Sequence, residues 1–559
     1  MKEAVVLRDV AGFADIDLHF AKFIAGFGGG ETAALAAALL SRNVRLGHTC
    51  LDLTRVPDDA DLAHLRGAGL SLEKWRTALE KNRAVGKPDN QLPLVLDGGG
   101  RLYLRRYWNY EQSLASAILR RCDAQSETGA AGTDPQQAAV ETALQRRFVV
   151  ISGGPGTGKT TTVFKILQHL VKSNAGDPLR IALAAPTGKA AARLQEAFSA
   201  ACGDEAIRDS LPESASTLHR LLGPRRGSVY FRHNQKNPLP FDLVVVDEAS
   251  MVALPLMAKF FDALAPQTRV ILLGDPDQLA SVEPGAVLGD IADAAKCGGE
   301  LRGSLVTLKK NYRFGNASVI FNLCENVRAG NADRSLELLR GAATAELVAS
   351  ETPSPSLLAV KLRASVLEGY GDYLQARAPA EALAAFQKFR VLCAHRSGAY
   401  GVEQLNRYVE SILRLAGLLG SGGTFYKGKP VLITRNDYQL RLFNGDIGIV
   451  MDDPADGSLC AWFSGRDETP RRVPLSRLPE HEPAFAMTVH KSQGSEFGST
   501  LLILPDKASP VLTRELVYTG LTRARLGVEI WFRDEVLRSA IERRQMRSSG
   551  LREKLISDE

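Results

Sequence analysis

The middle of the chain alternates short apolar runs with longer stretches of helical periodicity. Four runs rich in apolar and β-branched residues lie at 148–151, 181–185, 243–246 and 270–273. After the first run, Val163, Ile166, Leu167 and Leu170 recur at the spacing of one helical face. Continuous apolar strands that alternate with helices predict an α/β fold, in which helices cover both faces of a parallel sheet.

A second α/β pattern follows in the later half of the chain. Its apolar runs lie at 391–394, 431–434, 501–504 and 528–532, after a linker-like patch at 349–356. A β-rich stretch from about Asp446 to Pro483 interrupts the pattern and predicts a small β-barrel insertion. The charged C-terminus from Arg538 is expected to be a helix or tail that is only solvated.

The first part of the chain predicts a separate, mostly helical domain. One predicted helical face carries Ile16, Phe20, Phe23, Ile24 and Phe27. Gly28-Gly29-Gly30 should end that helix, a second helix should span 32–40, and Ser71 can cap a third. Residues 94–107 read as a hairpin around Gly98-Gly99-Gly100. Both a partner-docking domain and a structural cap fit this composition.

These patterns divide the chain into three predicted domains. Residues 1–124 form the helical N-terminal domain, and a polar linker follows at 125–133. Residues 125–305 form the first α/β domain and residues 306–559 the second, with the barrel insertion at about 446–483. A chain of 559 residues agrees with three or four domains of ~150 residues each.

A glycine-rich segment after the first strand predicts a phosphate site. Gly153-Gly154-Pro155-Gly156-Thr157-Gly158-Lys159-Thr160 lies between a predicted strand and a predicted helix. In that setting backbone N–H groups and the helix N-terminus attract a phosphate. Lys159 should reach the β- and γ-phosphates of a nucleoside triphosphate, and Thr160 should ligate Mg²⁺. The alternative is a tight turn of small residues.

Polar clusters follow the carboxyl ends of the other strands, where ligands bind in parallel α/β sheets. Asp247 is suited to hold Mg²⁺ through water, and Glu248 to act as the general base for a water molecule. The alternative for this pair is a helix cap. Further clusters lie at 186–191 and 274–278. Gln136, ahead of the phosphate loop, could offer its amide to adenine.

An insertion at 223–240 breaks the alternation. Val229, Tyr230 and Phe231 lie between basic and turn residues and predict a short β-hairpin standing off the first sheet. Its arginines and lysine could meet a polyanion, although a solvated basic loop remains an alternative.

Two arginines in the later half could reach the phosphates from the second α/β unit. Arg313 and Arg523 are each suited to stabilise charge on a γ-phosphate across a cleft. Isolated arginines are usually surface ion-pair partners, so only their local sequences make these two specific.

Composition adds few constraints. Charged residues make up 24% and apolar residues 45% of the chain, which is typical of a soluble protein with ample core. The net charge of +6 permits a nucleic-acid partner without arguing for one. The seven cysteines contain no C-x-x-C pair, which argues against a zinc or iron–sulfur site and suggests reduced thiols. Without a signal-like or membrane-length apolar run, a cytoplasmic protein is expected.

Eight segments of the chain follow one another in the order found in superfamily 1 DNA helicases. They are GGPGTGKT, APTGKAAARL, STLHRLLG, VVVDEASMV, GDPDQLASVEPGAVLGDI, LKKNYRF, TVHKSQGSEF and YTGLTRA. Within that superfamily the chain most resembles the RecD family, the alpha subunits of exodeoxyribonuclease V (the RecBCD complex). The segments LAAALLSR, GHTCLDL and LYLRRYW extend the resemblance to the N-terminal part, so it covers nearly the whole chain.

The resemblance implies two RecA-like P-loop motor domains and a role for each matching residue. The motor's catalytic residues would be Lys159, Glu248, Gln278, Arg313 and Arg523. ATP would be held by Gln136, Gly153, Gly154, Pro155, Gly156, Thr157, Gly158, Lys159, Thr160, Thr161 and Glu496, and Mg²⁺ by Thr160 and Asp247. Single-stranded DNA would pass along Pro186, Thr187, Thr217, His219, Thr488, His490 and Lys491. The insertion at 223–240 would be a strand-separating pin.

The resemblance also implies partners and an activity. The chain would be an ATP-dependent 5′–3′ DNA helicase that acts with RecB-like and RecC-like subunits at duplex ends in recombinational repair, and the N-terminal domain would dock to the RecC-like chain. A stand-alone RecD-like helicase is the alternative within the same class. A nuclease is disfavoured because no acidic cluster with a nearby lysine is present, and a scaffold with a dead ATP site is disfavoured because the motor residues are intact.

Overall fold

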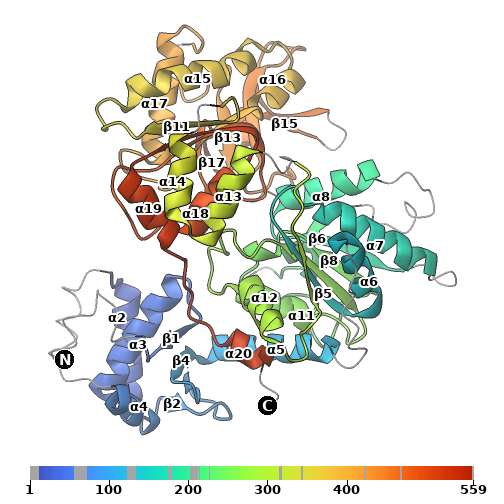
Figure 1. Cartoon of the computed structure of the whole chain (residues 1–559), viewed down its shortest axis with the longest axis vertical. Helices are drawn as coiled ribbons and strands as arrows, with labels where there is room; N and C mark the ends of the chain where they lie inside the picture. Colours follow the sequence, from blue (N-terminus) through green and yellow to red (C-terminus); the bar gives the residue numbers. More distant parts are fainter. Residues whose placement is uncertain are drawn as a thin grey trace.

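The computed structural model contains two parallel sheets, a small antiparallel sheet and an N-terminal α+β domain (Figure 1). It describes residues 12–55, 72–122, 134–173, 179–201, 212, 214–225, 227–313, 318–341, 344–420, 423–437, 439–465 and 469–556. The predicted α/β class with two parallel sheets is confirmed. The expected cap Ser71 and the linker at 125–133 lie outside the described residues.

The first parallel sheet has the strand order β10-β5-β9-β8-β6-β7. Its strands are β5 (Phe148–Gly153), β6 (Ile181–Ala185), β7 (Ser216–Thr217), β8 (Leu243–Val246), β9 (Arg269–Gly274) and β10 (Leu305–Leu308). The helices are α6 (Pro135–Gln145), α7 (Lys159–Ser173), α8 (Gly188–Ala201), α10 (Leu218–Leu222), α11 (Leu254–Asp262) and α12 (Val287–Cys297). Every residue of β5, β6 and β8 is buried, because helices cover both faces of the sheet. The four strands predicted for this unit are therefore confirmed.

The edge strand β10 corrects one expectation. The predicted boundary after residue 305 assigned this segment to the second unit, but β10 pairs in parallel with β5, with Leu305 opposite Val150. Arg313, which follows β10, therefore extends from the first sheet and not from the second. A short edge strand of only four residues gives no periodicity that would have assigned it to either sheet.

The second parallel sheet has the order β11-β20-β19-β12-β18. Its strands are β11 (Leu347–Glu351), β12 (Phe389–Cys393), β18 (Ala486–Thr488), β19 (Phe497–Ile503) and β20 (Ala524–Phe532). The surrounding helices are α13 (Val319–Ala329), α14 (Ala332–Arg340), α15 (Leu358–Gln375), α16 (Pro379–Phe386), α17 (Val402–Leu415), α18 (Arg514–Leu521) and α19 (Asp534–Glu542). The linker predicted at 349–356 was wrong in its first part, because 349–351 belong to β11, which pairs with β20.

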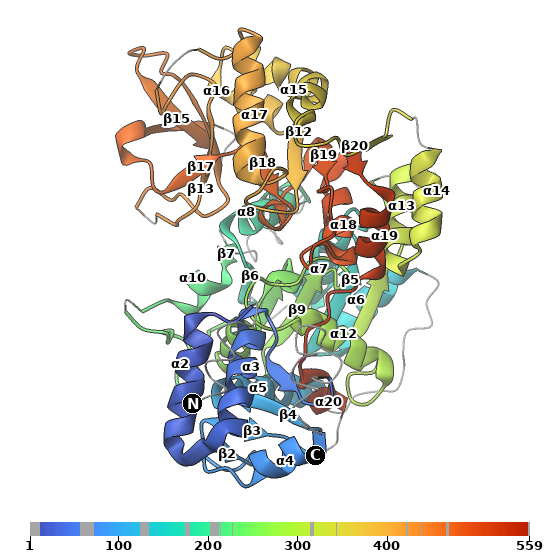
Figure 2. The same ribbon diagram turned by 90° about the vertical axis from the view of Figure 1, so that its left-hand side faces the viewer.

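A five-stranded antiparallel sheet lies beside β12 and β18 (Figure 2). It has the order β16-β15-β14-β13-β17, with β13 (Pro430–Ile433), β14 (Ile447–Asp452), β15 (Leu459–Ser464), β16 (Pro470–Pro474) and β17 (His481–Pro483). The run at 431–434, expected in the second parallel sheet, pairs instead with β14 and β17. Within the described residues β16 and β17 are not paired with each other, so the sheet is open there.

The N-terminal domain combines helices with a four-stranded sheet. Its helices are α2 (Asp15–Ile24), a π-helical turn (Ala25–Gly29), α3 (Gly30–Arg45) and α4 (Leu72–Glu80). The strands β1 (Cys50–Asp52), β2 (Val85–Gly86), β3 (Leu94–Leu96) and β4 (Arg101–Leu104) form a sheet in the order β1-β4-β3-β2. The predicted hairpin is the antiparallel pair β3–β4. Gly28 adopts a φ of 79° where the chain kinks between helices, a conformation that favours glycine.

The predicted apolar face of the first helix is only partly covered. Ile24 is fully buried, whereas Ile16, Phe23 and Phe27 are 60%, 57% and 48% exposed. Phe23 and Phe27 pack edge to face, with ring centroids 4.9 Å apart. The described structure therefore leaves an apolar patch of Ile16, Phe23 and Phe27 on this domain.

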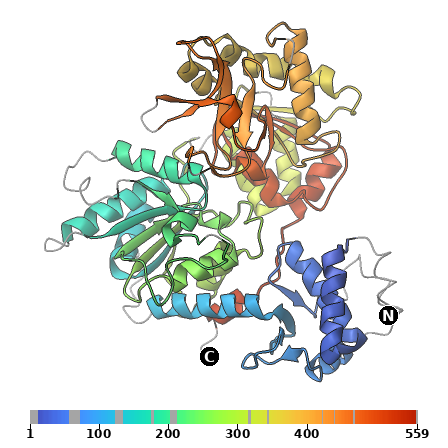
Figure 3. The same cartoon turned by 180° about the vertical axis from the view of Figure 1, so that it is seen from behind.

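The C-terminal segment returns to the first sheet, contrary to the expectation of a solvated tail. After α19 the chain runs back to α20 (Leu551–Ile556), which packs against α5 (Arg105–Cys122) and α12. Leu551 and Leu555 are buried in the same core as Phe148 and Val150 of β5. Figure 3 shows α20 next to α5 at the underside of the first sheet.

Polar contacts fix this segment to three parts of the molecule. Glu111 of α5 is fully buried, and its carboxylate accepts hydrogen bonds from Thr49, Ser549, Gly550 and Lys554. The Arg547 guanidinium donates to the backbone oxygens of Glu283 and Gly285, both at 2.9 Å. We call residues 543–556 the C-terminal strap, because they tie the second unit to the first sheet and the N-terminal domain.

No helix among the described residues has both the length and the apolar character that crossing a membrane requires.

Candidate nucleotide and nucleic-acid site

The phosphate loop has the conformation that its sequence predicts. β5 ends at Gly153, α7 begins at Lys159, and Gly156 and Gly158 between them adopt φ values of 79° and 82°. These left-handed conformations favour glycine and turn the loop's N–H groups inward. The Lys159 ammonium donates to the backbone oxygens of Gly153 and Gly154, at 2.6 and 3.0 Å. The lysine is therefore folded onto its own loop.

Gln136 lies beside this loop, as its position ahead of it predicted. α6 begins after Asp134, whose carboxylate accepts from the backbone N–H of Gln136 at 3.1 Å. The Gln136 side-chain oxygen accepts from Lys165 at 3.0 Å, and its nitrogen would lie 2.8 Å from a Cβ added at Gly158. The structure thus brings this amide next to the end of the phosphate loop.

Asp247 and Glu248 follow β8 at the same edge of the sheet. Glu248 has a φ of 51°, which is rare for a residue with a side chain and marks a strained backbone. Its backbone N–H donates to the Asp247 carboxylate at 2.8 Å. Burial and the charge of Glu248 raise the pKa of Asp247 to about 6, against the opposing charge of Lys159. A cation placed beside this carboxylate would therefore favour its ionised form.

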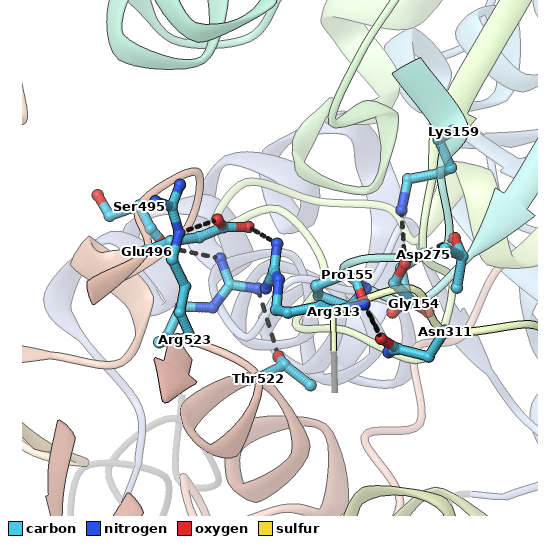
Figure 4. Close-up of polar contacts among 12 residues, drawn as sticks. Gly154, Pro155, Lys159, Asp275, Asn311, Arg313, Ser495, Glu496, Thr522 and Arg523 are labelled. Carbon is cyan, nitrogen blue, oxygen red and sulfur yellow. Dashed lines mark hydrogen bonds and ion pairs between the residues drawn. The ribbon is translucent and has the colours of Figure 1, made fainter. Parts of the chain in front are cut away.

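Glu496 lies between arginines from both units. Its carboxylate accepts from Arg313 at 2.5 Å and from Arg525 at 3.0 Å. Burial alone would raise the pKa of Glu496, but the charges of Arg313 and Arg193 outweigh it and hold the pKa at about 2. Figure 4 shows Arg313 and Arg523 side by side with this carboxylate.

The segment before Arg313 is fastened to the phosphate loop. Asn311 donates to the backbone oxygen of Pro155 at 3.0 Å, and the Tyr312 backbone N–H donates to that of Gly156 at 2.8 Å. One terminal nitrogen of Arg313, Nη1, is buried with no hydrogen-bond partner. A buried cationic donor without a partner, set against a glycine loop, fits an anion such as a triphosphate.

Gln278 and Arg523 meet across the two α/β units. The Arg523 guanidinium donates to the Gln278 side-chain oxygen at 3.1 Å and to the backbone oxygens of Ser495 and Thr519. Arg523 is almost fully buried, and this burial lowers its pKa. The structure therefore brings two of the predicted catalytic residues, one from each domain, into direct contact.

The predicted DNA-facing residues lie at strand ends of both sheets. Thr217 pairs in register with Ala185 at the end of β6, and its hydroxyl caps α10 by accepting from the N–H of Arg220. The Thr187 hydroxyl accepts from the backbone N–H of Ala190 at 3.2 Å, directly after Pro186. Thr160 and Thr161 lie in the first turn of α7.

The second sheet contributes Thr488, His490 and Lys491. Thr488 ends β18, and its hydroxyl accepts from the backbone N–H of Lys491 at 3.2 Å. The Lys491 ammonium is ion-paired with Glu482 at 2.5 Å. Burial, and then the charge of Arg547, lower the pKa of His490. Lys491 is therefore paired within the protein.

The insertion at 223–240 forms a short hairpin held by isolated bridges. Pro224 pairs with Phe231, and Asn234 with Asn237. Val229 and Tyr230 at its tip are 72% and 70% exposed. The imidazole of His219 lies edge-on to the Phe231 ring, with centroids 5.8 Å apart. The hairpin thus presents apolar side chains to solvent next to a predicted DNA-facing histidine.

Sequence reasoning missed three residues of the site. Arg193 of α8 acts on Glu496 through its charge, and Asp275 and Tyr518 form a buried pair between the two units. Asp275 lies in the GDPDQ cluster, a signal that could have found it. Tyr518 is 243 positions away from Asp275, so no local pattern connects them.

Three family models match separate parts of the chain. They describe the N-terminal domain of the RecBCD enzyme subunit RecD at 11–103, an AAA domain at 136–284 and a UvrD-like helicase C-terminal domain at 483–530.

Curated relatives match over most of the chain. The RecBCD enzyme subunit RecD of Mycolicibacterium smegmatis is 40% identical, over 93% of this chain and 93% of that protein. The same subunit of Haemophilus influenzae is 36% identical, over 94% and 93%. The ATP-dependent RecD2 DNA helicase of Deinococcus radiodurans is 32% identical, over 88% of this chain and 64% of that protein.

Proposed function

The chain belongs to the family of RecBCD enzyme RecD subunits, and on that premise we propose that it is an ATP-dependent 5′–3′ DNA helicase subunit. It would work with RecB-like and RecC-like chains at double-strand ends in recombinational repair, in the cytoplasm. The polarity and the partners follow from the family alone.

One observation carries the proposal: groups from two motor domains meet at one phosphate loop. Lys159, Asp247 and Gln278 belong to the first domain, whereas Arg523 belongs to the second, in the turn between α18 and β20. An arginine that reaches a triphosphate across a domain interface makes closure depend on the γ-phosphate. ATP turnover then becomes relative motion of the two domains.

Each residue has a proposed role in that cycle. The loop from Gly153 to Thr161 and Lys159 bind the phosphates, Gln136 reads adenine, and Glu496 lies near the ribose. Thr160 and Asp247 would hold Mg²⁺, which would supply charge neutralisation at the phosphates. The described residues contain no group of three or more His, Cys, Asp or Glu side chains that could hold a metal. Glu248 accepts the proton of the attacking water, while Gln278, Arg313 and Arg523 sense the γ-phosphate.

Single-stranded DNA is proposed to cross the ends of both sheets. Pro186, Thr187, Thr217 and His219 would contact it from the first motor domain, and Thr488, His490 and Lys491 from the second. Hydroxyls, backbone amides and a lysine grip phosphates without reading sequence. The exposed Val229 and Tyr230 support a strand-separating role for the hairpin at 223–240.

The apolar patch of Ile16, Phe23 and Phe27 supports a docking role for the N-terminal domain. Its proposed partner is the RecC-like chain. Any nuclease activity of the complex is assigned to a partner, and metal-dependent DNA cleavage by this chain alone would refute that assignment.

Substitution of the phosphate-loop lysine tests the proposal directly. A Lys159→Gln variant should assemble with its partners but lose DNA-stimulated ATP hydrolysis, because it removes the charge that binds the β- and γ-phosphates. Complex formation is checked by size exclusion and hydrolysis by phosphate release on a 5′-tailed duplex. Full hydrolysis by the variant would reject the proposed motor.

A stand-alone helicase remains the second candidate, favoured by the 32% identity to the RecD2 helicase. Purification from the native cell separates the two. Recovery of the chain as a lone, fully active monomer would favour the stand-alone enzyme, whereas recovery with two further subunits would favour the complex.

A further inference from the structure

The carboxylate of Asp275 joins hydrogen bonds from both motor domains. Asp275 follows β9 and is 3% exposed. One of its oxygens accepts from the Tyr518 hydroxyl at 2.9 Å and from the Gln278 side-chain nitrogen at 3.2 Å. The other oxygen accepts from the backbone N–H of Asp277 at 3.1 Å. Among its partners in the described residues, Tyr518 belongs to the second domain, whereas Gln278 and Asp277 belong to the first.

The chemistry of these partners fixes the orientation of the Gln278 amide. An ionised carboxylate only accepts hydrogen bonds, so the NH₂ end of the amide must face Asp275. The amide oxygen is then left to face Arg523, which only donates. A flipped amide would place two acceptors together at Asp275 and two donors together at Arg523.

Tyr518 links this arrangement to the second domain and to the phosphate loop. It belongs to α18 and is 3% exposed. A Cβ added at Gly154 would lie only 2.9 Å from the Tyr518 hydroxyl oxygen, so the tyrosine lies directly against the loop. The next residue, Thr519, accepts from the backbone N–H of Leu279 at 3.0 Å. Adjacent residues of α18 thus hold both sides of the segment that carries Gln278.

We propose that Tyr518 and Asp275 are positioning residues for ATP hydrolysis. The tyrosine hydroxyl holds the carboxylate, the carboxylate holds the Gln278 amide, and the amide presents its oxygen to Arg523. Because the hydroxyl belongs to the second domain, Gln278 is held in this orientation only while the two domains are docked. This inference rests on the proposed motor function, and it adds a route by which domain position controls the γ-phosphate sensor.

A pair of tyrosine variants tests the proposal. Tyr518→Phe deletes the hydroxyl at Asp275, and Tyr373→Phe deletes an equally buried hydroxyl that donates to the backbone oxygen of Gly428 at 2.7 Å, away from the interface. Both should lower the melting temperature similarly. Tyr518→Phe should lower the kcat of DNA-stimulated ATP hydrolysis about tenfold, the size of a lost hydrogen bond to a charged group. Its KM for ATP should stay within about twofold, because no contact to substrate is removed.

A double-mutant cycle separates positioning from mere stability. In a Gln278→Ala background, Tyr518→Phe should have little further effect on kcat, because its action passes through that amide. If Tyr518→Phe does not fold, Asp275→Asn replaces it, since an asparagine lets the Gln278 amide face either way.

The outcomes are distinct. The positioning role would be overturned if Tyr518→Phe kept the wild-type kcat, or if it lowered kcat no more than Tyr373→Phe does. It would also be overturned if the effects of Tyr518→Phe and Gln278→Ala on the activation free energy were additive. Absence of DNA-stimulated hydrolysis in the wild-type complex would instead reject the proposed motor function.

Discussion

Both parallel sheets contain a strand–loop–helix unit, but among the described residues only the unit of the first sheet has a glycine-rich phosphate loop. In the first sheet, β5 leads into α7, which begins with Lys159 and Thr160 and has no acidic residue in its first turn. In the second sheet, β12 leads into α17, whose first turn contains Glu403, paired with Arg396 at 3.6 Å. A carboxylate at a helix N-terminus satisfies the partial charge that would attract a phosphate. The same backbone arrangement thus gives a nucleotide site in one sheet and a filled helix end in the other.

The second sheet contributes instead through side chains that cross the interface. Arg523 and Tyr518 reach Gln278 and Asp275 of the first sheet. Glu496 of the second unit holds Arg313, which extends from the first. The comparison teaches that the phosphate loop belongs to the first sheet, whereas the second sheet supplies side chains that contact the residues around that loop across the interface.

The largest expected effect comes from removing the sensing arginine. Arg523→Ala should lower the kcat of ATP hydrolysis about 10³-fold, the loss typical of an arginine that stabilises transferring phosphate. ATP binding, measured with a fluorescent analogue, should change far less. Loss of binding in place of turnover would mean that the second sheet belongs to the binding site, which would break the comparison. Arg396→Ala, at the filled helix end of the second sheet, is the matched control and should leave hydrolysis unchanged.

A smaller effect is expected from neutralising the carboxylate between the arginines. Glu496→Gln keeps the shape and an acceptor oxygen, but it leaves Arg313 and Arg193 without their counter-charge. We expect KM for ATP to rise several-fold, in line with about 1 kcal/mol for a weakened charged hydrogen bond. Steady-state hydrolysis against ATP concentration measures this change. An unchanged KM together with a lowered kcat would instead assign Glu496 to the sensing side.

The smallest expected effect is on stability and depends on pH. Burial raises the pKa of Asp290 from 3.8 to about 8. A hydrogen bond from Ser549 opposes this shift, and the charge of Glu111 adds to it. The folded state then holds a proton that the unfolded state releases, so this group costs stability as the pH rises between those two values. Asp290→Asn should stabilise the protein by on the order of 1 kcal/mol at pH 8 and have little effect near pH 4.

Urea unfolding of wild type and Asp290→Asn at both pH values measures the difference. A stabilisation that does not vary with pH would show that Asp290 is ionised in the folded protein. The result also bears on the comparison of the two sheets. Asp290 lies where the C-terminal strap meets the core of the first sheet, so the measurement reports on the contact that ties the strap to that sheet.

The sequence predicted the motifs that lie within one continuous segment, but it did not predict the contacts between residues that are far apart in the chain. The phosphate loop and the polar residues after β8 and β9 could be located because each follows an apolar strand at a fixed spacing. The partners of these residues could not: Arg313 and Glu496 are 183 positions apart, and Asp275 and Tyr518 are 243 apart. Such pairs are set by how two domains dock, which no local pattern encodes.

The burial of the C-terminal strap could not be predicted from the sequence for the same reason. Leu551 and Leu555 are two apolar residues in a charged stretch, which is too short a face to predict burial. Arg313 was assigned to the wrong sheet because β10 is a four-residue edge strand. In each case the deciding contact lies with residues far away in the sequence.

The buried helix α20 also sets an order of assembly during synthesis. Leu551 and Leu555 complete a core that includes Phe148, Val150 and much of α5, all made more than 400 residues earlier. Domains usually fold as they leave the ribosome, starting from the N-terminus. Here the first motor domain keeps part of its apolar surface open until α20 has been made. A chain shortened before α20 would therefore lack the residues that cover the core of a domain translated long before it.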